Sequence, residues 1–316
     1  MGANSTFTEV VSTTLRNHQK SFADNVSSHN ALYYKMNKGG RIREVGGGYE
    51  LVEPLDYAQN STYQRYSGLD TLNIGSSEVL SAAKYDWKQA SIAVVISGLE
   101  MRQNSGREQI INLIESRITN AKRTAANSLS GDLYSAGSLS NQMGGIQNII
   151  QDDGTGTVGG IVSGTYTFWK NKFQQCAGTV AASTIRKDMM DLWVQVVRGQ
   201  DKPDIIISST ELFNLYWSSL AELQRFGDTE AGDTGFDTLK FKGVDVFHDT
   251  PESGIPANRM YMLNTQYLKL CVHKDANWTP MDERVPLQQD ALVKLMFWQG
   301  NLVCSNRARQ GVMLEG

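Results

Sequence analysis

The stretch that decides the fold, residues 104–134, reads NSGREQIINLIESRITNAKRTAANSLSGDLY. Apolar or small residues recur along it at the spacing of one helical stripe: Ile110, Ile114, Ile118, Ala121, Ala125 and Leu129. Asn104 or Ser105 can cap the start of this helix, and Gly131 can end it. The roughly 26 residues between these caps predict a rod of ~40 Å, which is too long for most small globular domains to cover. Other segments or other molecules must therefore lie along it.

The sequence on either side predicts how this helix is connected. Residues 91–100, SIAVVISGLE, are strongly β-prone and bounded by Gly98, so they predict a strand that feeds straight into the helix. After Tyr134, residues 135–169 are rich in glycine and serine, a composition that indicates a crossover between two subdomains.

Residues 183–226 predict a compact helix–strand–helix unit. Its first helix can start at Ser183 or Thr184 and end at Gly199, with one apolar face made of Met189, Leu192, Trp193, Val196 and Val197. PDIIIS, residues 203–208, reads as a short buried strand. Ser208 and Glu211 then form a capping-box pattern before a second apolar face of Leu212, Leu215, Tyr216, Leu220 and Leu223. Beyond this unit we expect paired strands with turns at Gly243, at Asn264-Thr265 and at Gly300-Asn301.

Residues 1–36 predict an amphipathic arm. A capping-box pattern at Thr6 and Glu9 precedes apolar residues at roughly helical spacing, among them Phe7, Val11, Leu15 and Phe22. The polar residues between them exclude a self-sufficient domain, so the apolar stripe is expected to dock on another surface. The basic residues of the arm form either a solvated face or a nonspecific, salt-sensitive contact with nucleic acid.

Residues 37–75 are the least globular part of the chain. RIREV at residues 41–45 and YELVEPL at residues 49–55 are strand candidates, and the glycines at 46–48 suit a three-residue hairpin loop between them. So little apolar sequence cannot build a core of its own, and long excursions of this kind are usually functional or disordered. Charges of both signs are available for a neighbouring surface, at Arg41, Arg43, Glu44, Glu50 and Glu53.

Composition narrows the class of protein. With 316 residues and 40% hydrophobic content the chain can bury a core, and a net charge of −3 argues against a strongly basic nucleic-acid clamp. Cys176, Cys271 and Cys304 are widely spaced among apolar or small neighbours, which favours buried reduced thiols and a reducing, cytoplasmic folding site. No export signal or membrane segment is expected.

The sequence patterns that could indicate a catalytic or ligand-binding site are weak. Gly154, Gly156 and Gly159 match the dinucleotide-binding spacing, but no helix is expected after them to receive phosphates, which favours a loop over a nucleotide-dependent enzyme. The histidines lack metal-ligand spacing, and the adjacent acidic pairs at 152–153 and 282–283 fit solvated turns. We therefore expect no catalytic residues, no metal and no cofactor.

The order of these parts resembles the major capsid proteins of tailed bacteriophages with the Hong Kong 97-type fold. The resemblance extends to VEPLDYAQNSTYQRYSG at residues 52–68, DWKQASIAVVISGLEMRQNSG at 86–106, FKGVDVFHD at 241–249 and NRMYMLNTQYLKL at 258–270. It implies an α+β chain with an N-terminal arm at 1–36, an extended loop at 37–78, a peripheral domain at 79–136 with 281–316 around the long spine helix, and an axial domain at 137–280.

The same resemblance implies a structural subunit that forms the pentamers and hexamers of an icosahedral head around double-stranded DNA. Its expected partners are other copies of itself, a portal protein, and scaffolding or decoration proteins; it would lie in the virion capsid after assembly in the bacterial host cytoplasm. Intersubunit contact is expected from loop residues, namely Arg41, Arg43, Glu44, Glu50, Glu53, Tyr63 and Arg65, and arm docking from Phe7, Val11, Leu15 and Phe22. The alternative is an encapsulin-like cellular shell that houses a cargo enzyme.

Overall fold

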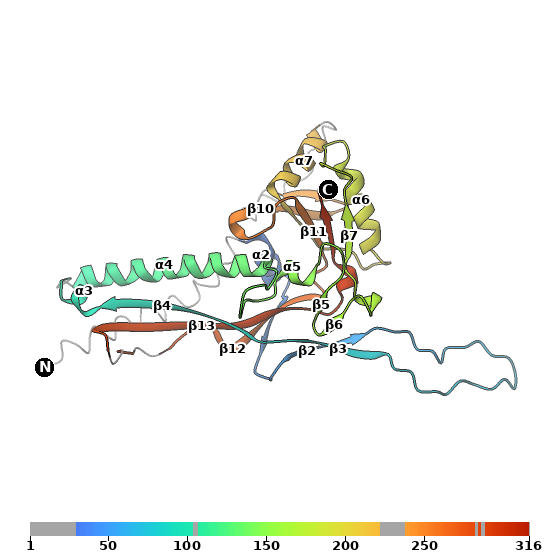
Figure 1. The fold of residues 1–316 in the computed structure, drawn as a ribbon, viewed down its shortest axis with the longest axis horizontal. Helices are drawn as coiled ribbons and strands as arrows, with labels where there is room; N and C mark the ends of the chain where they lie inside the picture. Colours follow the sequence, from blue (N-terminus) through green and yellow to red (C-terminus); the bar gives the residue numbers. More distant parts are fainter. Residues whose placement is uncertain (1–29, 104–106, 222–237, 282–283, 286–287, 316) are drawn as a thin grey trace.

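A computed structural model describes residues 30–103, 107–221, 238–281, 284–285 and 288–315. Figure 1 shows a long flat body from which a wedge rises at one end and a narrow loop projects beyond it. The body and the wedge are each built on a sheet, and a long helix joins them. The predicted arm residues Phe7, Val11, Leu15 and Phe22 lie outside the described residues.

The body is a four-stranded sheet with the strand order β1-β12-β13-β4. Its strands are β1 (Ile42–Val45), β12 (Leu268–Pro280), β13 (Ala291–Cys304) and β4 (Lys88–Ser97). The pairs β4–β13 and β12–β13 are antiparallel, whereas β1 joins β12 in parallel. A six-residue helix, α3 (Gly98–Gln103), follows β4 and leads to the spine helix α4 (Arg107–Tyr134). The strand-to-helix path predicted at Gly98 is therefore present, with α3 interposed.

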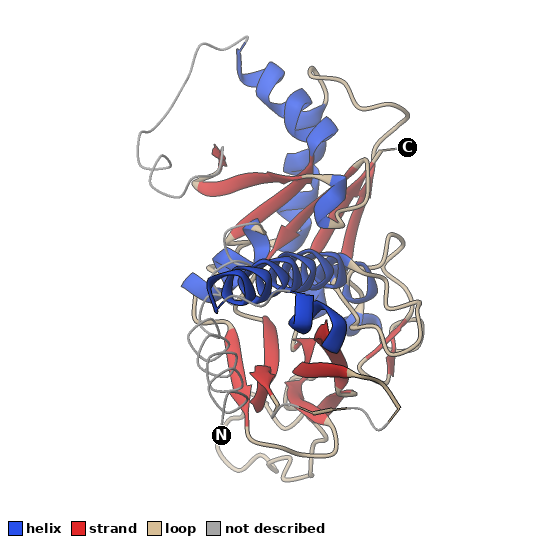
Figure 2. Ribbon diagram, turned by 90° about the vertical axis from the view of Figure 1, so that its left-hand side faces the viewer, coloured by secondary structure: helices blue, strands red, loops and turns tan. Residues whose placement is uncertain are grey.

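The spine helix lies over one face of this sheet (Figures 1 and 2). The predicted stripe is buried where its side chains are described: Ile118, Ala121, Ala125 and Leu129. The predicted end at Gly131 is wrong, because the helix continues to Tyr134. The close approach at this point depends on Gly254 instead: a Cβ built on Gly254 would lie 2.7 Å from the Gly131 Cα, whereas a Cβ on Gly131 would have no atom within 4 Å. The predicted caps at 104 and 105 lie outside the described residues.

The wedge is a six-stranded sheet with the order β7-β14-β11-β8-β10-β9. Its strands are β7 (Lys172–Gln175), β14 (Gly311–Leu314), β11 (Arg259–Leu263), β8 (Ile205–Ser209), β10 (Val244–Asp249) and β9 (Thr238–Phe241). Helices α6 (Ile185–Val196) and α7 (Thr210–Ala221) cover one face, so the predicted helix–strand–helix unit is confirmed. The second helix starts at Thr210, which places Ser208 in the strand rather than at the helix cap.

The opposite face of the six-stranded sheet packs toward the spine. Helix α2 (Ala31–Lys38) and the one-turn helix α5 (Ile146–Ile149) contribute to the same core cluster as Ile207 and Tyr261 of this sheet and Leu133 of α4. One continuous core therefore connects the two sheets, and a second cluster lies under α6 and α7. All three cysteines are free and buried, as predicted.

The predicted hairpin between residues 41–45 and 49–55 is wrong. β1 pairs with β12, and β2 (Leu51–Asp56) pairs with β3 (Leu80–Tyr85), so residues 46–50 carry the chain from the sheet to a separate two-stranded ribbon. Beside the long β12, all four residues of β1 find a pairing partner on one side, which a short isolated glycine-rich hairpin would support only marginally. The part of the chain that projects beyond both sheets lies between β2 and β3, at residues 57–79.

Two of the three predicted turns differ from the structure. Lys242 and Gly243 do form the turn between β9 and β10. Asn264-Thr265 instead connects strands of different sheets, because β11 ends at Leu263 in the six-stranded sheet and β12 belongs to the four-stranded one. Gly300-Asn301 lies inside β13, where a Cβ on Gly300 would come within 2.6 Å of the Cys271 carbonyl oxygen. This glycine permits close strand packing rather than a turn.

The predicted domain boundaries stay a prediction, but sheet membership shows how the chain crosses between the sheets. β12 lies beside β13 in the four-stranded sheet, and the chain returns to the six-stranded sheet with its final strand β14. The chain therefore enters each sheet more than once, which ties the two sheets together.

Candidate assembly surfaces

The extended loop leaves the body at the ribbon of β2 and β3. Residues 57–79 connect these strands, and the Tyr57 backbone N–H donates to the Val79 carbonyl oxygen at 3.0 Å at its base. Figure 1 shows the loop projecting beyond both sheets. Farther out, Gln64 bridges its two arms: its amide donates to the Thr71 carbonyl oxygen at 3.0 Å and accepts from the Asn73 N–H at 3.1 Å. These side-chain bridges give the loop a defined path without a hydrophobic core.

Large apolar side chains on this loop face solvent. Leu69 is fully exposed, Ile74 is 92% exposed and Tyr63 is 80% exposed, and Tyr66 and Leu72 are exposed as well. A group of this kind on one narrow element is typical of a surface that binds another protein. The loop thus offers aromatic and aliphatic contacts that its own subunit does not cover.

Three of the charged residues predicted for intersubunit contact are engaged inside the chain. Glu53 is only 5% exposed; it accepts from the Arg43 Nη1 at 2.7 Å, and the Lys269 Nζ lies 3.7 Å from its other oxygen. Glu50 lies 3.6 Å from the Lys84 Nζ. Pairing of β2 with β3 turns Glu53 inward in the alternating pattern of the strand, so this carboxylate stabilises the root of the loop.

Most of the other residues predicted for intersubunit contact are exposed. Glu44, Tyr63 and Arg65 are exposed, whereas Arg41 is half-buried and its backbone N–H donates to the Met36 carbonyl oxygen at 2.8 Å. Glu44 lies in the edge strand β1 and Arg41 directly precedes it, whereas Tyr63 and Arg65 lie on the projecting loop. A role in contacts between copies stays a prediction for all of them.

A second hairpin packs against β3, close to where the extended loop leaves the body. We call this contact the clasp, and the β2–β3 ribbon the root of the loop. It consists of β5 (Thr157–Val158) and β6 (Ile161–Val162), and the Gly159 carbonyl oxygen at its turn accepts from the Lys84 N–H at 3.0 Å. A Cβ on Gly159 would lie 2.8 Å from the Ala83 Cβ. Tyr57 stacks on Phe168 with ring centroids 5.2 Å apart. These contacts fix the direction in which the loop leaves the body.

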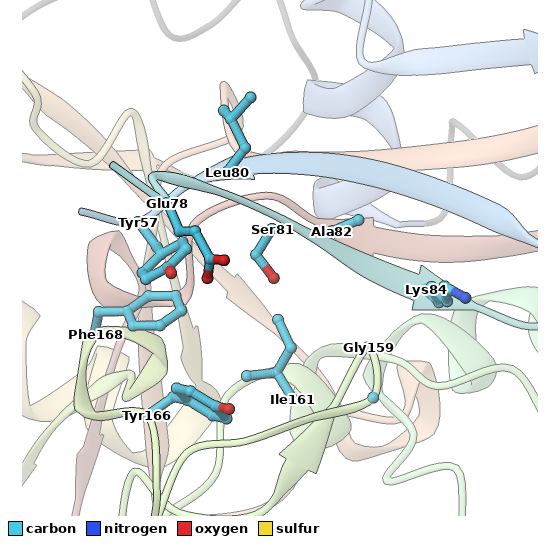
Figure 3. A pocket seen from close by; sticks show the side chains of 11 residues that line it. Tyr57, Glu78, Leu80, Ser81, Ala82, Lys84, Gly159, Ile161, Tyr166 and Phe168 are labelled. Carbon is cyan, nitrogen blue, oxygen red and sulfur yellow. The ribbon is translucent and has the colours of Figure 1, made fainter. Parts of the chain in front are cut away.

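A cavity of ≈ 470 Å³ lies beside this clasp. Figure 3 shows Tyr57, Phe168 and Tyr166 gathered near Glu78, with Ile161 on the facing hairpin and Lys84 at the other end. The lining mixes aromatic rings with two charged groups of opposite sign. The cavity lies where β3 and the β5–β6 hairpin meet, at the base of the extended loop.

Helix α2 anchors the point where residues 1–29 join the described chain. Asn30 is fully buried at its N-cap: its Oδ1 accepts from the Tyr33 N–H at 2.8 Å, and its Nδ2 donates to the Ser130 Oγ at 2.6 Å. The Ser130 Oγ in turn donates to the Ser253 carbonyl oxygen at 2.9 Å. This chain of hydrogen bonds joins α2, the spine helix and the short helix η3 (Pro251–Ser253).

A groove of ≈ 480 Å³ runs between the spine helix and β4, which is an edge strand of the four-stranded sheet. Ile92 and Val94 line it on the strand side, and Asn120 and Thr124 line it on the helix side. Arg117 donates to the Val95 carbonyl oxygen and to Glu100, and so occupies part of the free edge. The rest of the groove is open to a neighbouring molecule.

A buried acid lies where the spine meets the six-stranded sheet. The Tyr134 hydroxyl donates to the Asp249 Oδ2 at 2.8 Å, and both side chains are buried. Burial raises the pKa of Asp249 above its ordinary value, and burial together with the adjacent carboxylate raises the pKa of Tyr134. This single hydrogen bond connects the end of the spine helix to β10 of the six-stranded sheet; we call this place the joint between the sheets.

Residues that sequence reasoning missed hold the glycine-rich crossover in place. Arg307 is fully buried; its Nε donates to the Ile149 carbonyl oxygen at 2.6 Å and its Nη2 to the Asn171 Oδ1 at 2.9 Å. Burial lowers the pKa of this guanidinium. The clasp residues Gly159 and Phe168 were missed too. An arginine or a glycine in a loop-like sequence carries no local signal for such long-range contacts.

The chemical patterns weighed in the sequence do not converge. Gly154, Gly156 and Gly159 lie in and before the β5–β6 hairpin, with no α-helix directly after them. Across the described ranges, no group of three or more histidine, cysteine or acidic side chains could hold a metal ion. Within the same ranges no helix is long and apolar enough to cross a membrane.

Solved structures of viral and virus-like shells share this fold. A chain of the cyanophage A-1(L) capsid asymmetric unit matches with a TM-score of 0.67 and 16% identity, over 87% of this chain and 90% of that chain. A chain of the satellite phage P4 procapsid, which includes the size determination protein Sid, matches with a TM-score of 0.52 and 13% identity, over 96% and 90%. The virus-like particle from Pyrococcus furiosus matches with a TM-score of 0.50 and 12% identity, over 93% and 96%.

No protein-family model and no curated protein sequence matches the chain. The structural matches span nearly all of both chains, so the α+β, Hong Kong 97-type capsid fold predicted from the sequence is confirmed.

Proposed function

We propose that this chain is the major capsid subunit of a tailed phage. Copies of it assemble into the pentamers and hexamers of a closed icosahedral head that encloses double-stranded DNA. The observation that carries the proposal is the projecting loop, which exposes Tyr63, Leu69 and Ile74 on a capsid-type fold and has no core of its own. A head-to-tail contact between identical subunits covers such a loop and closes into rings.

The role is structural rather than enzymatic. Its mechanism is geometric: the clasp at Gly159 and Phe168 sets the direction of the loop, and the loop reaches a neighbouring copy. Obligate interfaces of this kind typically bury about 2,000–5,000 Å². The chain would lie in the virion capsid after assembly in the bacterial host cytoplasm.

Further partners follow from the same proposal. A portal protein would occupy one vertex, and scaffolding or decoration proteins would assist assembly; the P4 procapsid contains a size determination protein beside its capsid protein. Contact with packaged DNA would be nonspecific, because a net charge of −3 leaves only local basic patches.

The proposal is tested by sedimentation of the purified chain, alone and coexpressed with a scaffolding protein. We expect particles far heavier than the 35.0 kDa subunit. A chain that sediments as a monomer under every assembly condition would refute it.

The match to the virus-like particle from Pyrococcus furiosus supports a second candidate, a cellular shell that houses a cargo enzyme. The contents of particles isolated from the natural source distinguish the two. Nuclease-protected double-stranded DNA supports a phage head, and a co-purifying enzyme without DNA supports the cellular shell.

A further inference from the structure

The four-stranded sheet has one face that the spine helix does not cover. Successive residues of a strand point to opposite faces, and Val94 and Ile96 of β4 are buried on the side of α4. The residues between them point the other way, and their partners on β13 share that face. We call this surface the open face; the register defines it as Ala93 opposite Leu295, Val95 opposite Val293, and Phe297 beside them.

The open face is apolar although no described helix lies on it. Val95 is 40% exposed, Ala93 is exposed, and Val293, Leu295 and Phe297 are half-buried. None of the five belongs to the two hydrophobic clusters of the described chain or packs against them. A solvated face of an antiparallel sheet normally carries polar residues at these alternating positions. Valine, leucine and phenylalanine there indicate a surface that another element covers.

The N-terminal segment meets the requirements for that element. Residues 1–29 precede Asn30, which is fixed beside Ser130 near the end of the spine helix. A 29-residue segment spans at most ~95 Å when extended, whereas the 28-residue spine helix is only ~42 Å long. The segment can therefore reach any point of the open face, and it carries an apolar stripe with no core of its own.

We propose that the stripe of Phe7, Val11, Leu15 and Phe22 docks on the open face of its own subunit, so that the sheet is covered by the spine helix on one side and by the arm on the other. The tether at Asn30 favours the arm of the same chain, because a covalent connection to the binding site raises the effective concentration to the order of mM. The extended loop of the same chain projects from the opposite end of the body (Figure 1), so a loop could cover this face only from a second copy.

Paired cysteines test the proposal in the full-length, unassembled chain. Leu15→Cys is combined with Leu295→Cys on the open face and treated with a short bismaleimide cross-linker. The native thiols will not interfere, because Cys176, Cys271 and Cys304 are buried and burial raises the pKa of each, to about 12, about 11 and about 12 respectively. We expect an internally cross-linked monomer with altered mobility on a denaturing gel.

Two control pairs identify other outcomes. Leu15→Cys with Val194→Cys, an exposed valine on α6, should stay unlinked. Equal linking at Val194 would show that the arm has no preferred site and would overturn the proposal. A cross-linked dimer in the Leu15–Leu295 pair would assign the face to another copy's arm, and a dimer in Leu72→Cys with Leu295→Cys would assign it to another copy's loop. Either dimer overturns docking within one subunit.

A second readout uses trypsin sites within the arm, at Arg16 and Lys20. A charge on the open face, Leu295→Asp, should release the arm and increase cleavage there by about tenfold, the effect of losing ~1.4 kcal/mol of docking free energy. Val194→Asp serves as the matched surface variant and should leave the cleavage rate unchanged. An unchanged rate in Leu295→Asp overturns the proposal. Neither experiment requires particles, so failure here is distinct from failure of the proposed capsid function, which the sedimentation of whole particles decides.

Discussion

Alanine substitutions at Gly159 and Gly160 separate two costs: the strain of a left-handed backbone, and the clash of an added Cβ with β3. Both have a left-handed backbone, with φ of +60° and +76°, but a Cβ on Gly159 would meet Ala83 at 2.8 Å whereas a Cβ on Gly160 would have no atom within 4 Å. Gly160→Ala should cost only the backbone strain, about 1–2 kcal/mol. Gly159→Ala should cost a further ~1–3 kcal/mol because it overpacks the contact with β3.

Thermal unfolding of the two variants beside the parent chain measures this difference. Equal shifts in melting temperature for Gly159→Ala and Gly160→Ala would show that the β5–β6 hairpin does not press on the root of the loop.

Asp249 gives the joint between the sheets a pH dependence with a defined sign. Burial raises its pKa above the ordinary value of 3.8, despite hydrogen bonds from Tyr134, Ser253 and Thr250 and the nearby His248, which lower it. The native state therefore binds a proton at higher pH than the unfolded chain does. At neutral pH, burying the ionised Asp249 carboxylate lowers the free energy of unfolding. This destabilisation disappears as the pH falls through the raised pKa toward 3.8.

Asp249→Asn removes this titration while keeping the size of the side chain. Relative to this variant, the parent chain should gain stability as the pH falls from neutral toward the ordinary carboxyl pKa of 3.8. The melting-temperature difference between the two proteins, followed across that range, checks the sign. A difference that stays constant, or that moves against the parent chain on acidification, would contradict the assignment.

The spine helix shows how far a periodic pattern predicts an element. Its stripe at Ile118, Ala121, Ala125 and Leu129 is buried as expected, because any partner must cover the same face. Its end was misplaced because Gly131 stays helical and the helix continues to Tyr134, where the glycine signal for a helix end does not apply. The hairpin at residues 41–55 failed because β1 takes its partner from residues 270–273, beyond the reach of local turn signals.

Ile118 tests whether the stripe carries the stability of the body. It is fully buried between the spine and the sheet, so Ile118→Ala should lose about 2–5 kcal/mol. Arg123→Ala, at an exposed position on the same helix, should change stability by no more than about 0.5 kcal/mol. Comparable losses of melting temperature in both variants would contradict the burial pattern.

Folding of the subunit should not depend on the extended loop. Replacing residues 59–77 with Asn-Gly keeps the β2–β3 ribbon and the Tyr57–Val79 hydrogen bond, and removes only side chains outside the core. We expect a folded subunit with a melting temperature close to that of the parent chain, and no shells. Circular dichroism and sedimentation measure the two properties.

A milder variant serves as the control for loop length. Tyr63→Ser, Leu69→Ser and Ile74→Ser together keep the loop and remove its exposed apolar contacts. It should weaken assembly in the same direction. Shells formed at normal yield by the shortened chain would show that the loop is not the assembly surface.

At the scale of the whole molecule, the sequence predicted the order of parts better than the contacts of particular residues. The spine, the helix–strand–helix unit and the buried cysteines follow from local periodicity and spacing, and each is present. Glu53 could not be placed, because its inward orientation depends on pairing of β2 with β3 and on Lys269 from a distant strand. The clasp and Arg307 were missed because their contacts join segments far apart in the chain.

We propose that the chain builds closed shells from copies of itself. Electron microscopy of the purified protein, alone and coexpressed with a scaffolding protein, shows whether such shells form. We expect uniform hollow particles with icosahedral outlines, and no such particles from the chain with the shortened loop. A persistently monomeric, compact species under all assembly conditions would contradict it.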